Sequence, residues 1–448
     1  MVQKAGYQRN LLSTAIAGAL GSFSFGYNLG SLNAIELEMQ KCSREVEWDK
    51  ITLSKECFRV SELTWGYVAS IICLGALVGC VIGGKLVDKI GRKGTIRWSN
   101  AFYIPGLLML ALASNVSFLI VGRLMVGMGI GVSCVAVPLF LTEISSWDVR
   151  GLVGSFHQAA IVIGYLISLI IGYFFTNLIH YSWSWRLILG FDLIPCIVQL
   201  WALTCESPKY LYKDRAREGE ATLKWLRGSG YDPEELHEFQ KEPDPSMGFL
   251  EFLKLRPRGL TTIIMLHMGQ QFSGINGILY FSTNLFKDGS PRIAPLVPIF
   301  IAILNIIMTF VALGFIDKTG RRPLMLISSF GMTISSAVFV TSLLVNNFAL
   351  KVVSVLGFVA LFAVGMGPVP WLLLGELFPQ NQVGAGVTLG VTVNWLCNFA
   401  VVSIFPILVQ SLKNFFLLPF LVFLSIFTVW AWLELPETKG GFTKSNPS

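Results

Sequence analysis

The sequence predicts an all-α integral membrane protein with twelve transmembrane helices in two pseudo-symmetric six-helix halves. Of its 448 residues, 53% are hydrophobic and only 14% are charged, and the mean hydropathy is +0.64. Soluble domains carry about 25% charged residues, so these values exclude an ordinary soluble fold. Two further observations complete the prediction: twelve apolar segments of spanning length, and charged motifs that recur after 229 to 233 residues.

The twelve apolar segments are each expected to form a helix. A span needs about 20 mostly apolar residues, and hydrocarbon cannot satisfy an open backbone. No segment has the sustained alternation of a barrel strand. The segments are 11–33, 62–84, 97–114, 118–141, 152–176, 185–204, 260–286, 294–316, 323–346, 351–375, 384–410 and 414–434.

The basic residues predict the orientation of these helices. Of the 34 Lys and Arg residues, 23 lie on one side of the predicted membrane and 10 on the other, with Arg123 inside a span. Cytoplasmic loops carry the excess of Lys and Arg, so both termini are expected in the cytoplasm. The net charge of +7 is spread between apolar runs, which favours contact with a lipid bilayer over nucleic-acid binding.

Only one long polar insert, 205–258, lies on the predicted cytoplasmic side. We therefore expect a six-helix half at 1–204, a cytoplasmic linker with short amphipathic helices at 205–258, a second half at 259–435 and a short cytoplasmic tail at 436–448. Breaks in the linker are expected at Gly228–Gly230 and Pro243–Pro245.

Three motif pairs indicate that the halves are homologous. Asp88-Lys-Ile-Gly-Arg-Lys-Gly returns as Asp317-Lys-Thr-Gly-Arg-Arg-Pro, Glu143 as Glu376, and Glu206-Ser-Pro-Lys as Glu437-Thr-Lys. Any one pair alone fits a solvated turn with anchoring charges. Together, at one offset and on one side, they are typical of a transporter whose halves rock around a central site.

These charges are expected to form ion pairs that hold the halves together on the cytoplasmic side and break when the protein opens inward. The candidate latch residues are Asp88, Arg92, Glu143, Arg150, Glu206, Asp317, Arg321, Arg322, Glu376 and Glu437.

Neutral polar side chains cluster within the spans. The seventh segment carries Gln270, Gln271 and Asn276, and others carry Gln158, Asn305, Asn394 and Asn398. Amides both donate and accept hydrogen bonds, as sugar hydroxyls do, and suit an ion poorly. The rings of Trp371 and Trp395 could cover the C–H face of a sugar. The alternative for each amide is a hydrogen bond between helices.

Glycines and prolines interrupt two of the same segments. Gly274 and Gly277 flank Asn276, while Gly365, Gly367, Pro368 and Pro370 lie in the tenth segment. Such interruptions predict discontinuous gating helices. Close helix packing through glycine is the alternative for Gly274 and Gly277.

The eight cysteines do not form a disulfide framework, because six lie in or near spans. Cys42 and Cys57 fall in the predicted outer loop, where a disulfide is possible. The four scattered histidines show no ligand spacing, so neither a metal site nor an organic cofactor is expected. Nothing in the sequence indicates an obligate protein partner.

In these motifs the chain resembles the sugar porter family of the major facilitator superfamily, especially its eukaryotic facilitative glucose transporters. The resemblance covers nearly the whole chain and is carried by motifs in family order. These are Gly21-Ser-Phe-Ser-Phe-Gly-Tyr-Asn28, Asp88 to Lys93, Pro138-Leu-Phe-Leu-Thr-Glu143, Arg150-Gly151, Glu206-Ser-Pro, Gln270 to Asn276, Gly320-Arg-Arg, Gly367-Pro-Val-Pro-Trp371 with Glu376, Asn394-Trp395 and Pro436-Glu-Thr-Lys-Gly440.

The resemblance implies a hexose transporter working by alternating access, without a cofactor, in the plasma membrane. It implies a small neutral sugar held by Gln158, Gln270, Gln271, Asn276, Asn305, Trp371 and Asn394, with Phe25 nearby. Tyr280 would belong to an outer gate, and Gly367 and Pro368 to a discontinuous gating helix. The charged residues would form the inner latch, and 205–258 an intracellular helical domain.

The chain departs from the family pattern at three places. Ala363 stands where many glucose porters carry Glu, and Val383 stands where Arg is usual, so one partner of Glu376 is expected to be missing. Asn28 replaces an Asp of family symporters that can pair with an Arg matching Arg123. Asn28 cannot titrate, which favours uniport.

Asp192 favours the alternative, a proton-coupled sugar symporter, because an intramembrane carboxylate is a candidate proton site. The other interpretation of Asp192 is a carboxylate that is hydrogen-bonded to its neighbours or faces a wet cavity. A sugar sensor with a transporter fold would carry a long cytoplasmic tail, whereas the chain ends eight residues after Gly440. An enzyme would need a convergent nucleophile, base or metal cluster, which the sequence does not offer.

Overall fold

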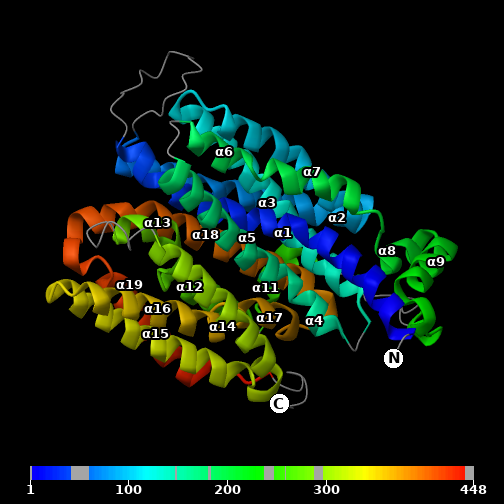
Figure 1. Cartoon of the computed structure of the whole chain (residues 1–448). Helices are drawn as coiled ribbons and strands as arrows, with labels where there is room; N and C mark the ends of the chain where they lie inside the picture. Colours follow the sequence, from blue (N-terminus) through cyan, green and yellow to red (C-terminus); the bar gives the residue numbers. More distant parts are fainter. Residues whose placement is uncertain are drawn as a thin grey trace. The chain divides into compact units, whose positions relative to one another are not determined.

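The computed structural model describes residues 3–41, 60–146, 149–179, 183–236, 247–257, 259–286 and 296–438, and its regular structure is helical throughout these ranges (Figure 1). Helix covers most of the described part of each of the twelve predicted segments. The helices of the first half are α1 (Gln3–Lys41), α2 (Glu62–Ala111), α3 (Val116–Ile144), α4 (Arg150–Gly154), α5 (Phe156–Tyr173), the π-helix η2 (Phe174–Ile179), α6 (Ser184–Gly190) and α7 (Leu193–Ala202).

The polar linker and the second half complete the chain. The linker contains α8 (Pro208–Asp214), α9 (Ala216–Arg227), the short 3₁₀ turn η3 (Gly228–Gly230) and α11 (Phe249–Leu255). The second half contains α12 (Gly259–Phe272), α13 (Ile275–Leu285), α14 (Val297–Thr319), α15 (Arg321–Leu344), α16 (Phe348–Val364), α17 (Val369–Glu376), α18 (Gln380–Leu412), η5 (Lys413–Phe415) and α19 (Leu418–Glu434).

Seven helical stretches in the described residues are long and apolar enough to cross a membrane, and two shorter apolar helices accompany them. One of the seven, Leu63–Ala111, contains two predicted segments, which meet at the non-helical Gly91. The shorter helices, Val297–Ala312 and Leu418–Glu434, lie in the eighth and twelfth segments. The two remaining segments are α1, which is long but carries more polar residues, and the interrupted pair α12 and α13.

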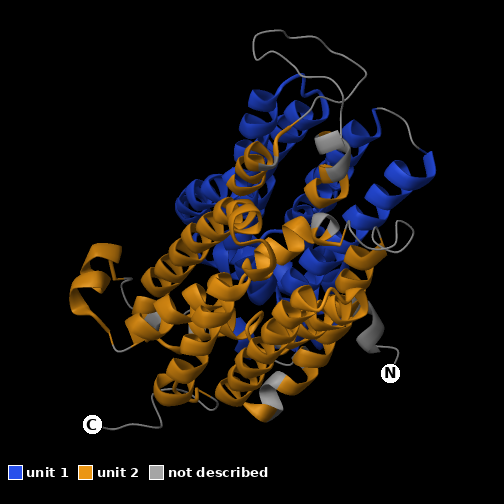
Figure 2. Cartoon of the chain, turned by 90° about the vertical axis from the view of Figure 1, so that its left-hand side faces the viewer, with its two compact units in different colours: residues 1–31, 43–58, 71–243 blue, residues 32–42, 59–70, 244–448 orange. Residues whose placement is uncertain are grey.

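The chain divides into two compact units, coloured separately in Figure 2. Unit 1 comprises residues 1–31, 43–58 and 71–243, and unit 2 comprises residues 32–42, 59–70 and 244–448. Of the linker helices, α8 and α9 belong to unit 1 and α11 to unit 2. The end of α1 and the start of α2 belong to unit 2, so this unit includes helix from the first half of the sequence.

Glycines allow α2 and α3 to pack backbone against backbone in unit 1. A Cβ at Gly79 would lie 2.1 Å from the carbonyl oxygen of Met128, and one at Gly131 would lie 2.1 Å from that of Ala76. No side chain fits at such distances, because the obstructing atoms are main-chain atoms that cannot move aside. This close packing positions the bend of α2 at Gly91 and the end of α3, where the charged motifs lie.

The two predicted helix interruptions are present in unit 2. Between α12 and α13 the chain turns at Ser273 and Gly274, and Gly274 has a φ of +85°. Between α16 and α17 it turns at residues 365–368. Both breaks lie next to polar or aromatic residues predicted to hold the sugar, and their gating role stays a prediction.

Candidate functional site

Four amide side chains form a continuous hydrogen-bonded array in unit 2. Asn394 of α18 donates from Nδ2 to Gln270 Oε1 at 2.7 Å, and its Oδ1 accepts from Gln271 Nε2 at 3.1 Å. Asn276 of α13 donates to Gln271 Oε1 at 2.6 Å. Gln270, Gln271 and Asn394 are at most 5% exposed, whereas Asn276 is half-buried. Three separated parts of the sequence thus form a single, largely buried hydrogen-bonded network without a formal charge.

The break between α16 and α17 supplies the acceptors that orient this array. Gln270 Nε2 donates to the backbone carbonyls of Met366 at 2.8 Å and Gly367 at 2.9 Å. In a continuous helix the Met366 carbonyl would accept from the N–H of residue 370, but Pro370 has none. The predicted helix interruption and the predicted amide site are therefore two parts of one structure.

The other residues predicted for unit 2 lie on α14, α16 and α17 and at the break between α16 and α17. Trp371, at the start of α17, is 38% exposed, and its ring lies edge to face with that of His267, 5.2 Å between centroids. Asn305 is buried on α14, and its carbonyl accepts from Thr309. Gly367 and Pro368 form the break itself. The departure at Ala363 is buried on α16.

The predicted outer gate is tied to the end of α1. Tyr280 of α13 is buried, and its neighbours Leu279 and Ser282 both accept hydrogen bonds from Asn33. The Asn33 Nδ2 to Leu279 O distance is 2.9 Å. Sequence reasoning missed Asn33, although a buried amide near the end of an apolar segment was the available signal.

The remaining predicted sugar contacts belong to unit 1. Gln158 on α5 and Phe25 on α1 are both half-buried. Next to Gln158, His157 shares a hydrogen bond of 2.7 Å between its Nδ1 and Ser22 Oγ. The structure therefore joins four of the predicted residues, Gln270, Gln271, Asn276 and Asn394, in one hydrogen-bonded array, while Gln158 and Phe25 belong to unit 1.

Asn28 links the two charged residues that lie inside the spans of unit 1. Its Nδ2 donates to Asp192 Oδ2 at 2.7 Å, and its carbonyl accepts from Arg123 Nη1 at 2.8 Å. All three residues are at most 1% exposed. Asp192 is thus a buried carboxylate with a hydrogen bond to a neighbouring helix, as one of the two interpretations of the sequence expects.

The first charge cluster, Arg92, Glu143, Glu206 and Ser207, lies where α3 ends and α2 changes direction. Arg92 Nη2 is 2.7 Å from Glu143 Oε1, and Ser207 Oγ donates to Glu143 Oε2. Glu206 accepts the backbone N–H groups of Arg92 at 3.1 Å and Lys93 at 2.9 Å. A carboxylate at the start of a helix is favourable because those N–H groups have no helical partner.

The second charge cluster, Arg321, Glu376, Glu437 and Thr438, repeats this arrangement in unit 2. Arg321 Nη2 is 2.8 Å from Glu376 Oε1, and Thr438 Oγ1 donates to Glu376 Oε2. Glu437 accepts the backbone N–H groups of Arg321 at 3.0 Å and Arg322 at 3.2 Å. The predicted repeat is thus also a repeat of contacts, and Glu376 has as many partners described as Glu143.

Each of these ion pairs joins residues of one unit, whereas the sequence reasoning expected pairs between the halves. Of the other latch candidates, Asp88 is exposed, and Arg322 donates from Nη2 to the carbonyl of Trp432 at 2.7 Å. The side chains of Arg150 and Asp317, and the cysteines Cys42 and Cys57, lie outside the described part of the structure. Ser207 and Thr438 were missed, although each directly follows a repeated glutamate.

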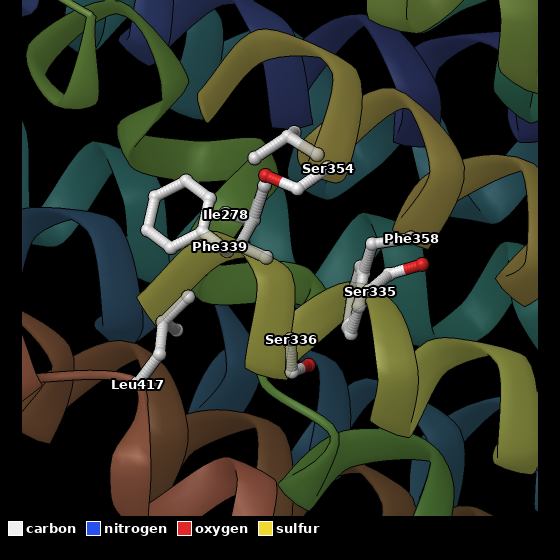
Figure 3. Close-up of a pocket in the computed structure, with 8 residues that line it drawn as sticks. Ile278, Ser335, Ser336, Phe339, Ser354, Phe358 and Leu417 are labelled. Atoms are coloured by element: carbon white, nitrogen blue, oxygen red, sulfur yellow. The ribbon is translucent and has the colours of Figure 1, made fainter. Parts of the chain in front are cut away.

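A small gap lies between α13, α15 and α16 (Figure 3). Its walls include Ile278, Ser335, Ser336, Phe339, Ser354, Val355, Phe358 and Leu417. It has no room for even a water molecule, whereas ligand pockets measure roughly 300–1,000 Å³. Ser354 Oγ donates to its own helix, to the Lys351 carbonyl at 2.9 Å. The gap is a packing defect rather than a binding site.

Comparisons with known proteins give consistent matches over nearly the whole chain. A model of the family "Sugar (and other) transporter" matches residues 14–446. Human solute carrier family 2, facilitated glucose transporter member 14 is 31% identical over 449 residues, covering 96% of this chain and 86% of that protein. Facilitated glucose transporter protein 1 of Caenorhabditis elegans is 33% identical over 459 residues, with 96% and 88% covered.

Solved structures share the fold. The inward open conformation of the xylose transporter XylE from E. coli has a TM-score of 0.80 at 24% identity, with 96% of this chain and 97% of that chain covered. The proton:xylose symporter XylE bound to 6-bromo-6-deoxy-D-glucose has a TM-score of 0.79 at 24% identity, with 97% and 98% covered.

Proposed function

Since the chain belongs to the sugar transporter family of the major facilitator superfamily, we propose that it carries a neutral hexose across the plasma membrane by facilitated diffusion. The amide array of Gln270, Gln271, Asn276 and Asn394 is the observation that carries this proposal. It offers donors and acceptors without a formal charge, which suits a ligand built from hydroxyl groups. Relatives at 31% and 33% identity are described as facilitated glucose transporters, which supports a hexose.

The sugar is held mainly by the second half. Asn276 is the most exposed member of the array and the first to meet a hydroxyl group, while Trp371 presents a partly exposed ring. Gln158, Phe25 and Asn305 complete the site. The breaks at Gly274 and at Gly367–Pro368 let α13 and α17 bend around the sugar, with Tyr280 closing the outer side.

The charge clusters support the closed inner gate. Each one fixes the cytoplasmic ends of three chain segments within its half, so that the two inner surfaces are rigid when they meet. Opening requires only that these contacts differ between the two states, because a conformational equilibrium responds to differences in free energy.

Uniport is favoured by the environment of Asp192. Its carboxylate accepts a hydrogen bond from Asn28, which itself cannot exchange a proton, and Arg123 bonds the same residue from the other side. This supports a structural carboxylate that, through Asn28, helps to hold α1, α3 and the sixth segment together. Proton symport is the second candidate, because Asp192 is a buried carboxylate and a structural neighbour is a proton:xylose symporter.

Counterflow in proteoliposomes tests the coupling. We expect labelled hexose to accumulate against preloaded unlabelled hexose without a proton gradient, and an uncoupler to leave initial uptake unchanged. Adding sugar should not alkalinise the medium. Sugar-dependent proton uptake that is lost in Asp192→Asn would establish symport instead, while a wild-type protein that moves no hexose would refute the proposed function.

Cysteine labelling in intact cells tests the orientation. Val345, in the exposed turn after α15, is expected outside, and Lys213, exposed on α8, inside. Val345→Cys should react with an impermeant maleimide before permeabilisation and Lys213→Cys only afterwards, each compared with the parent protein. Reaction of Lys213→Cys in intact cells would reverse the assigned orientation, and signal only from an internal membrane would exclude the plasma membrane.

A further inference from the structure

We infer that His267 is a positioning residue that fixes the amide of Asn394 in the orientation the sugar site requires. This inference rests on the proposed function and names a residue outside the amide array. His267 lies on α12 one helical turn before Gln270, is fully buried, and has its Nδ1 3.0 Å from Asn394 Nδ2. A histidine three residues before two glutamines was the signal available in the sequence.

The direction of every hydrogen bond in the array follows from two backbone carbonyls. The carbonyls of Met366 and Gly367 can only accept, so both Gln270 Nε2 protons are directed at them. Gln270 Oε1 is therefore left to accept from Asn394 Nδ2. Asn394 Oδ1 in turn accepts from Gln271 Nε2, and Gln271 Oε1 accepts from Asn276.

This order determines the form of the imidazole. The second Nδ2 proton of Asn394 is directed at His267 Nδ1, which must then be an acceptor. His267 is therefore neutral and carries its proton on Nε2. Without an acceptor at residue 267 that proton of Asn394 loses its partner, and the amide is held only by the two glutamines.

Packing keeps the imidazole in place. A Cβ at Gly390 of α18 would lie 2.9 Å from His267 Nε2, so the ring occupies the space above this glycine. The Trp371 ring lies against it edge to face, 5.2 Å away. His267 thus contacts α17 and α18 at once and links the amide array to the ring expected to cover the sugar.

The test is a double-mutant cycle between His267 and Asn394, read by hexose uptake in proteoliposomes. His267→Leu should raise KM about fivefold, the value of one neutral hydrogen bond, with maximal turnover within about twofold of wild type. His267→Gln restores an acceptor and should recover most of the affinity. In an Asn394→Ala background His267→Leu should have no further effect on KM, because the residue acts through Asn394.

Each outcome has one meaning. An unchanged KM in His267→Leu, or effects of the two substitutions that multiply, would overturn the positioning role, since a direct sugar contact acts independently of Asn394. The Tm values of the wild-type protein, the two single variants and the double variant, measured without sugar, test the contact itself. Additive shifts in Tm would also overturn the positioning role. A wild-type protein that takes up no hexose yet shows coupled Tm shifts would refute the proposed function and leave the His267–Asn394 contact supported.

Discussion

Gln270→Ala should lower hexose uptake at limiting sugar concentration by about 50-fold, with the protein still folded. Gln270 has four hydrogen-bond partners: Met366, Gly367, Asn394 and Gln271. An alanine leaves the buried Met366 carbonyl and the half-buried Gly367 carbonyl without their donor, the first at about 1–3 kcal/mol, and removes the acceptor that orients Asn394. The break in the helix is also no longer held against α12, so both binding and the gating movement are affected.

Uptake of labelled sugar in proteoliposomes measures this effect, and Gln410→Ala is the matched control. Gln410 is an exposed glutamine on α18, the helix that also carries Asn394. Its replacement should leave uptake within about twofold of wild type, as expected of a surface change. Size-exclusion profiles and Tm values establish folding for both variants. Wild-type uptake by a folded Gln270→Ala protein would remove the array from the proposed sugar site.

The sequence was sufficient to identify the array but not its hydrogen bonds. Amides in apolar helices are rare enough to indicate Gln270, Gln271 and Asn394 individually. Which amide donates to which depends on the carbonyls of Met366 and Gly367 at the helix break, almost a hundred residues further along the chain. His267 was missed for the same reason, because a single histidine in an apolar segment has no assignable partner until α18 is placed beside α12.

The repeat predicted which residues of the two charge clusters correspond, but not which of them form ion pairs. The offsets of 229 to 233 residues correctly paired Arg92 with Arg321 and Glu143 with Glu376 as counterparts. They could not indicate that each arginine pairs with the glutamate of its own half, since spacing along the chain carries no information on which helix ends meet. The hydroxyl groups of Ser207 and Thr438 were likewise recognisable only once the carboxylates were in place.

Gly91→Ala and Gly320→Ala should each lower transport about tenfold and Tm by several degrees, an effect due to backbone shape rather than charge. Gly91 has φ +82° and ψ 175°, and Gly320 has φ +97° and ψ 165°. This region is almost restricted to glycine, and another residue there costs about 1–3 kcal/mol. A Cβ would also lie 2.5 Å from Glu206 Oε2 in the first case and 2.7 Å from Glu437 Oε2 in the second.

The backbone strain and the clash of the added Cβ with the glutamate both disturb the charge clusters. The turn at each glycine exposes the first N–H groups of the following helix, which Glu206 and Glu437 bind. If the carboxylate is displaced, Arg92 or Arg321 loses the backbone position from which it reaches Glu143 or Glu376. Under the proposed function, the rigid inner surface of that half should then be lost, the closed inner gate destabilised relative to the inward-open state, and the transport cycle slowed.

Gly84→Ala and Gly314→Ala are the matched controls, one in each half and on the same helices α2 and α14. A Cβ at either position meets nothing within 4 Å, so both variants should transport and melt like the wild-type protein. Equal losses in the test and control pairs would show that these helices tolerate no added methyl group, and the turn would then have no special role. A loss at Gly91 alone would mean that the two charge clusters, although alike in geometry, do not contribute equally to closing the inner gate.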